Sequence, residues 1–134
     1  MFARSPEAGR YRPHVIIAHS SPAYAHAVAR AFRRQGWIAL QAADGPDARL
    51  AATNCPGSLI VLDVDLPGES GWLTCAKLHM DNPDHRVVLV AAHQSERNDD
   101  FAEFSGATRM VTEEQGPDPV LEAAGIGLPA TQAV

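Results

Sequence analysis

Apolar residues in this chain fall into short uninterrupted runs, separated by stretches in which they recur at helical spacing. The clearest run, from Leu59 to Leu62, is too short for a helix and rich in branched side chains. Such runs are typical of strands that are buried on both faces of a parallel sheet. We therefore predict strands over residues 14–18, 37–42, 59–62, 86–92 and 106–111.

Helix signals fill the stretches between these strands. Ser21 is a good N-cap residue with Pro22 directly after it, and the apolar spacing that follows stops at Gly36. We predict helices over residues 22–35, 44–53, 71–80, 95–104 and 118–124.

Large apolar residues on these helices and strands are expected to form the core. Phe32, Trp37 and Trp72 are best explained as core or helix-packing residues. In the helix over residues 71–80, an apolar stripe at helical spacing is formed by Trp72, Cys75 and Leu78, and is expected to be widened by Leu73, Ala76 and Met80.

Alternating strands and helices predict an α/β fold, with one parallel sheet and helices on both of its faces. The pattern covers residues 13–124 as a single domain. Residues 1–12 and 125–134 show no usable period and are expected to be flexible arms at the two ends of that domain.

Composition narrows the functional classes. The 134 residues carry a net charge of -5, so there is no bulk basic field for nucleic acid, although six of the eleven basic residues fall in the first 34 positions. The two cysteines have no metal-binding spacing, and neither a signal peptide nor a long apolar span is visible. We expect a cytoplasmic protein that binds neither membrane nor nucleic acid.

Two carboxylates, Asp63 and Asp65, follow the central strand directly, and Pro67 and Gly68 then turn the chain. The carboxyl ends of parallel strands are where open α/β sheets place their ligand sites. This end of the strand is therefore the expected functional site.

Four motifs of this sequence, by their order and spacing along the chain, together resemble the receiver domain of two-component response regulators. That domain has a CheY-like, flavodoxin-like fold, and the resemblance covers about residues 13–124. They are the segment 62–68 followed by Gly71, Ala43-Asp44-Gly45, Ala92-His93 and Gly106-Ala107. The resemblance implies a five-stranded parallel sheet and places a phosphoacceptor at Asp63. The implied donor is a histidine kinase or a phosphotransfer protein, and the implied protein is a signalling domain and no enzyme.

In this sequence, most of the groups that would support phosphoryl transfer to Asp63 are replaced. The resemblance implies an acidic pair for Mg²⁺, a hydroxyl residue, a switch aromatic and a lysine, whose positions carry His19 with Ser20, Ala91, Met110 and Glu113. Phosphoryl transfer to a carboxylate depends on cations that neutralise the developing charge. If Glu113 points inward, an aspartyl phosphate becomes hard to form.

Three hypotheses follow. The first is a degenerate receiver, or pseudo-receiver, that acts through protein contacts with a kinase, a phosphotransfer protein, a downstream effector or a second copy. The second is a working phosphoacceptor, in which Asp63 and Asp65 retain a weak Mg²⁺ site. The third is a small metal-binding flavodoxin-like domain, in which His19, Asp63 and His93 would hold a transition metal.

Overall fold

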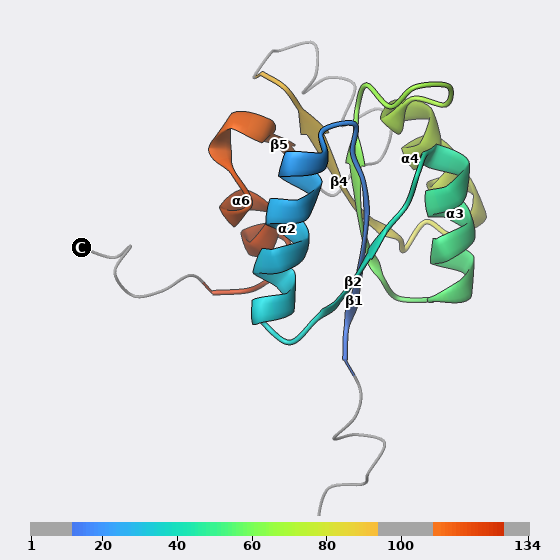
Figure 1. The fold of residues 1–134 in the computed structure, drawn as a ribbon. Coiled ribbons are helices and arrows are strands. Elements are labelled where there is room, and N and C mark those ends of the chain that lie inside the picture. Colours follow the sequence, from blue (N-terminus) through green and yellow to red (C-terminus); the bar gives the residue numbers. More distant parts are fainter. Residues whose placement is uncertain (1–11, 94–108, 128–134) are drawn as a thin grey trace, which may run out of the picture.

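The structure is a computed structural model that describes residues 12–93 and 109–127 of the chain (Figure 1). The strands in these residues are β1 (His14–Ala18), β2 (Ile38–Gln41), β3 (Leu59–Asp63), β4 (Arg86–Ala91) and β5 (Arg109–Thr112). The helices are α2 (Pro22–Arg34), α3 (Gly45–Asn54), α4 (Gly71–Asp81) and α6 (Asp118–Ala123), with a short 3-10 helix η1 (Glu113–Gln115) after β5.

The five strands form one parallel sheet in the order β2-β1-β3-β4-β5. Ala18 pairs with Leu62, and Asp63 pairs with Val90, so the carboxyl ends of β1, β3 and β4 lie side by side. This order is that of the flavodoxin-like fold. The predicted α/β architecture is therefore confirmed.

Helices cover both faces of the sheet: α2 and α6 lie on one side, and α3 and α4 on the other (Figure 1). Successive residues of a strand point to opposite faces. Leu59 and Val61 accordingly pack in the core under α2 and α6, whereas Ile60 and Leu62 pack in the core under α3 and α4. By the same alternation, the side chain of Asp63 points to the side of α2 and α6.

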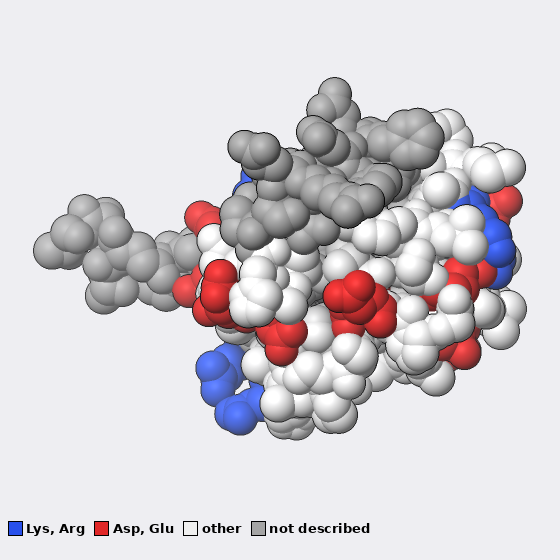
Figure 2. Space-filling model, turned by 90° about the horizontal axis from the view of Figure 1, so that it is seen from above, with Lys and Arg blue, Asp and Glu red and all other residues white. Residues whose placement is uncertain are grey.

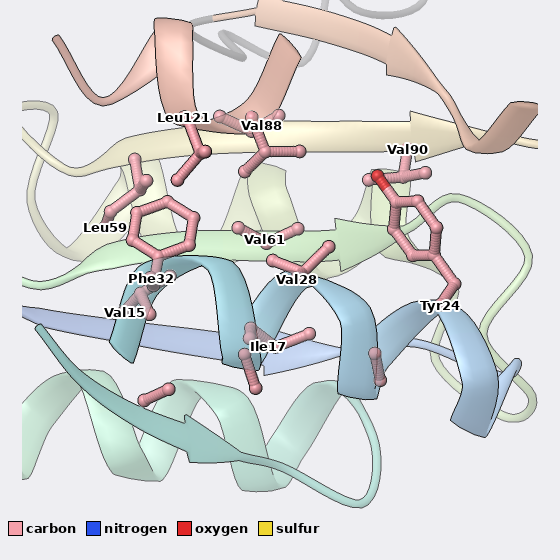
Figure 3. Packing of buried hydrophobic residues seen from close by; sticks show 14 of the residues in the cluster. Val15, Ile17, Tyr24, Val28, Phe32, Leu59, Val61, Val88, Val90 and Leu121 are labelled. Carbon is pink, nitrogen blue, oxygen red and sulfur yellow. The ribbon is translucent and has the colours of Figure 1, made fainter. Parts of the chain in front are cut away.

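The core under α2 is built from branched strand residues and from aromatic side chains (Figure 3). Phe32 is fully buried and packs edge-on against Trp37, with ring centroids 5.0 Å apart. Tyr24, near the start of α2, points its hydroxyl toward Val90 at the carboxyl end of β4 (Figure 3). The core roles predicted for Phe32 and Trp37 are confirmed, and Trp72 packs at the edge of the opposite core.

Short-range sequence signals explain where the helices begin. The Ser21 hydroxyl accepts a hydrogen bond from the Tyr24 amide at 3.3 Å, which caps α2 as predicted. The Ser70 hydroxyl caps α4 in the same way, by accepting from the Leu73 amide at 3.2 Å. Gly36 ends the first helical segment with a φ of 87°, a conformation that glycine adopts without strain.

The predicted strands and helices are found in the described residues, with most bounds within one residue of those expected. The fifth strand is described from Arg109, and residues 106–108 lie outside the described chain. The predicted helix over residues 95–104 lies outside it as well.

One prediction about α4 was wrong. Leu73 and Met80 do not widen the buried stripe, because their side chains are 47% and 83% exposed. The polar residue Thr74 is buried instead, one position along from Leu73. Each residue turns a helix by about 100°, so Thr74 falls on the face of Cys75 and Leu78, and Leu73 does not.

The packed chain continues past Ala124, where the flexible tail was expected to begin. The Ile126 amide donates to the Leu121 carbonyl at 3.0 Å, and its side chain packs against the core under α2. Residues 1–11 and 128–134 of the two expected arms lie outside the described chain. None of the described helices is both long and apolar enough to cross a membrane.

Candidate functional site

Asp63, the last residue of β3, is held by hydrogen bonds from two neighbouring segments. Its Oδ2 accepts from the Ser20 amide at 3.0 Å and also from the Ser20 hydroxyl. Its Oδ1 accepts from the Asp65 amide at 2.9 Å. The residue is only 5% exposed, so both carboxylate oxygens are buried and bonded to the chain itself.

These contacts determine the charge of Asp63. Burial by itself would raise the pKa of the carboxyl group, but the hydrogen bonds from Ser20 and from the Asp65 amide favour the charged form. The nearby His19 adds a smaller effect in the same direction, and the net result is a pKa below the ordinary value. Asp63 is therefore ionised at neutral pH.

His19 lies between two carboxylates. Its Nδ1 is 3.8 Å from Asp63 Oδ2, and its Nε2 is 3.8 Å from Glu113 Oε2. The Ser21 amide donates to Nδ1 at 2.9 Å, so in the neutral ring the proton is on Nε2 and faces Glu113. The His19 side chain is 2% exposed, which makes it a fixed part of the site's interior.

Glu113 begins η1 directly after β5 and points toward the site. Of the two orientations left open by the sequence, inward or toward solvent, the structure shows the inward one, with the side chain 37% exposed. Among the described residues, no lysine or arginine pairs with Asp63 or Glu113. A carboxylate thus occupies the position where the resemblance expected a cation.

Tyr24 lies against His19 and forms part of the site, although the sequence did not mark it as a site residue. Its ring centroid is 4.6 Å from that of His19, and its buried hydroxyl has no hydrogen-bond partner in the described structure. Burial, and secondarily the negative charge of Glu113, raise the pKa of Tyr24 well above its ordinary value. Its helical phase indicated burial, but nothing local indicated contact with His19.

The remaining predicted site residues lie around this centre without joining it. Asp65 is exposed and reaches Asp63 through its backbone amide. Ala91 is 1% exposed at the end of β4, and Met110 packs at the edge of the core beneath α3 and α4. His93 is exposed, with its Nδ1 3.7 Å from Glu114 Oε2.

A second carboxylate, Glu69, lies in the loop between β3 and α4 and has cationic partners. Arg49 donates to both of its oxygens, at 3.1 and 3.0 Å, and Lys77 donates at 2.9 Å. The Thr74 hydroxyl adds a bond of 2.6 Å. The bond from Arg49 is the main cause that lowers the pKa of Glu69 to about 2, with burial opposing it and Thr74 and Lys77 assisting.

Figure 2 looks onto the edge of the sheet where the strands end. Aspartate and glutamate side chains lie across the middle of this face, and lysine and arginine side chains lie toward its margins. The only lysine of the chain, Lys77, and Arg49 are both engaged by Glu69. The centre around Asp63 is therefore acidic.

The family model for the response regulator receiver domain matches residues 15–124 of this sequence. The chain belongs to this family. Receiver domains are signalling domains of two-component systems that interact with histidine kinases or effectors, and this receiver has the CheY-like fold.

Individual relatives agree with this assignment. The chain is 37% identical over 78 residues to a probable transcriptional regulatory protein, TcrX, of Mycobacterium tuberculosis, a match that covers 58% of the chain and 33% of TcrX. This chain therefore matches about a third of the length of that relative.

Among solved structures, the receiver resembles the chemotaxis protein CheY4 of Vibrio cholerae. The TM-score is 0.78 at 19% identity, over 86% of this chain and 98% of CheY4. A response regulator of Burkholderia pseudomallei with a phosphorylated aspartic acid, a calcium ion and citrate gives 0.74 at 21% identity, over 90% of this chain and 70% of that one. Both likenesses concern the fold.

Mg²⁺, which the resemblance implies, does not fit the residues of this receiver. Mg²⁺ takes oxygen ligands in octahedral geometry. At the positions of the expected acidic pair, His19 offers a nitrogen and Ser20 directs its N–H and O–H toward Asp63 Oδ2. Asp63 Oδ2, which a metal would need as a ligand, thus already accepts hydrogen bonds from Ser20.

The transition-metal hypothesis also lacks its ligands. Among residues 12–93 and 109–127, no three histidine, cysteine, aspartate or glutamate side chains are placed to hold a metal ion together. His93 lies against Glu114 and not against His19 and Asp63. The ends of the adjacent strands meet as predicted, but these three side chains do not converge.

Proposed function

We propose that this chain is a degenerate receiver domain that signals through protein contacts, with little or no Mg²⁺-dependent phosphorylation at Asp63. The observation that carries the proposal is the arrangement of Asp63 and Glu113. Both oxygens of Asp63 accept hydrogen bonds from Ser20 and Asp65, and a glutamate faces the site from the lysine position.

The physical argument concerns charge. The phosphoryl group is anionic and Asp63 is ionised, so the transition state needs cations close to both. Two unit charges about 5 Å apart, at an effective dielectric constant near 20, interact by roughly 3 kcal/mol. Replacing an attractive lysine by Glu113 therefore shifts the energy by up to about twice that amount, against the phosphorylated state.

The hydrogen bonds of Ser20 act in the same direction. To attack a phosphorus atom, an oxygen of Asp63 has to exchange one of these hydrogen bonds for the incoming group. Hydrogen bonds to charged groups contribute about 1.5–3 kcal/mol each. The geometry of Ser20 thus favours the resting carboxylate over the acyl phosphate.

A partner would then recognise the unphosphorylated surface. The partner class that we propose is a histidine kinase, a phosphotransfer protein or a downstream effector. Because Asp63 is not modified in this account, binding of the partner is regulated by the amount or the location of the receiver and of that partner.

Intact-mass measurement after incubation with Mg²⁺ and acetyl phosphate tests the proposal. We expect the unmodified mass to remain dominant. A gain of one phosphoryl group in the wild type that is lost in Asp63→Asn would contradict the proposal. That result would support the second candidate, a working phosphoacceptor, which the ionised state of Asp63 favours.

A further inference from the structure

A groove runs between α2 and α6, on the face of the sheet away from α3 and α4. Its cavity volume is about 460 Å³. The α2 side is formed by Ala27, Arg30, Ala31 and Arg34, and Leu121 lies on the α6 side. This volume is in the range of cavities that bind ligands, and it has no role in the site around Asp63.

Two arginines on the rim of the groove have no partner within the described chain. Arg30 and Arg34 are exposed and lie one helical turn apart, so their side chains emerge on the same side of α2. Neither has a hydrogen bond or an ion pair within the described chain, and this includes Asp118, which also lines the groove.

Three other arginines of the described structure have partners. Arg33 donates to the Ala39 carbonyl at 3.1 Å, and Arg12 donates to the Gly36 carbonyl at 3.0 Å. Arg49 is bound by Glu69. Arg86 and Arg109 are also exposed without a partner in the described chain, but neither lines the groove. Arg30 and Arg34 are therefore the free guanidinium groups that a ligand in the groove can reach, and their fork geometry suits carboxylates.

Beside these arginines, the α2 wall of the groove carries alanines. Ala27 and Ala31 place only methyl groups toward it, so the backbone of another helix can approach α2 closely. Grooves of this kind bind amphipathic helices, which insert residues spaced by three or four positions. Carboxylates at the same spacing would meet Arg30 and Arg34.

We propose that this groove binds an acidic helical segment of a partner protein. The chain has a net charge of -5, and the edge of the sheet at Asp63 is acidic, so an acidic partner is repelled there and attracted to Arg30 and Arg34. With a rise of about 1.5 Å per residue, Arg34 lies roughly 20 Å along α2 from Ser21. The residues that line the groove are not among the hydrogen-bond or ion-pair partners of Asp63.

The probe is a synthetic alanine-based helical peptide with glutamates four residues apart, and its control has glutamines at those positions. Amide NMR spectra of the full chain should show shifts at Ala27, Ala31 and Leu121 with the glutamate peptide, and these should weaken as salt is added. The double variant Arg30→Glu/Arg34→Glu should reduce the affinity by at least about tenfold. The control Arg86→Glu/Arg109→Glu makes the same charge change at two exposed arginines elsewhere and should retain binding.

The proposal is overturned if the glutamate peptide shifts no groove amides, or if the glutamine peptide shifts them equally. It is also overturned if groove amides shift on dilution of the free protein, which would make a second copy the occupant, or on removal of residues 128–134. Should the charge reversal unfold the chain, Arg30→Gln/Arg34→Gln removes the same charges without adding new ones and must then lose binding.

Discussion

Two carboxylates six residues apart in the sequence, Asp63 and Glu69, show how this receiver uses charge. Glu69 binds Arg49 and Lys77, while Asp63 is held by the polar groups of Ser20 and the Asp65 amide. Arg49 and Lys77 carry the kind of charge that a phosphoacceptor site needs, but they pair with the loop that leads into α4. The difference suggests that this loop is stabilised for packing and the acceptor is stabilised as a resting carboxylate.

The largest effect is expected from Gly71→Ala, which tests how tightly the loop packs against the acceptor strand. A Cβ atom at Gly71 would lie 2.2 Å from the Asp63 carbonyl oxygen, so the backbone of one segment has to move. Overpacking against backbone costs about 3 kcal/mol, at the upper end of the usual range. Urea denaturation should show this loss in the free energy of unfolding.

The matched control for Gly71 is Gly127→Ala, because no atom lies within 4 Å of a Cβ placed there. Its free energy of unfolding should change by less than about 0.5 kcal/mol. Equal stability of the two variants would mean that the contact between the loop and β3 is loose.

A smaller effect is expected from Glu69→Gln. The variant loses the charged bonds with Arg49 and Lys77, which should lower the free energy of unfolding at neutral pH by about 1–2 kcal/mol. The pKa of Glu69 is lowered in the fold to about 2 from an ordinary 4.5. Its stabilisation is therefore complete above about pH 4.5 and is lost as the pH falls toward 2.

Denaturation of the wild type and of Glu69→Gln at several pH values measures the difference between their free energies of unfolding. The gap should close as the pH is lowered through that window. Glu122→Gln, which changes an exposed glutamate on α6, serves as the control. A gap that stays constant with pH would show that the ion pairs contribute nothing to stability.

The smallest effect is expected from Glu113→Gln, and it concerns the pKa of Tyr24. In Glu113→Gln the negative charge beside Tyr24 is lost, so the pKa of this tyrosine should fall, while burial still holds it above its ordinary value. Tyrosinate absorbance during alkaline titration measures the shift, and Tyr24→Phe assigns the signal between the two tyrosines of the chain. An unchanged titration would place Glu113 away from the site in solution.

Much of the fold could be predicted from the sequence because its signals are local. The apolar run of β3, the cap at Ser21 and the turn at Gly36 each act within a few residues. The prediction for Leu73 and Met80 failed because apolar character alone does not fix the phase of a helix face. Both side chains remain exposed beside the buried Thr74.

The site was predictable only in part. The end of β3 and the position of Asp63 followed from the pattern of strands. The donation from Ser20 to Asp63, the contact between Tyr24 and His19, and the partners of Glu69 depend on side-chain directions across different elements. No local pattern encodes these directions, so the sequence could name the altered positions but not their contacts.

The most direct test of the account restores the missing groups. The triple variant His19→Asp/Ser20→Asp/Glu113→Lys replaces the imidazole and the hydroxyl by carboxylates and the facing glutamate by a cation. Incubated side by side with acetyl phosphate and Mg²⁺, the triple variant should gain one phosphoryl group by intact mass, and the wild type should remain unmodified. Equal phosphorylation of the two proteins, abolished in each by Asp63→Asn, would contradict the account.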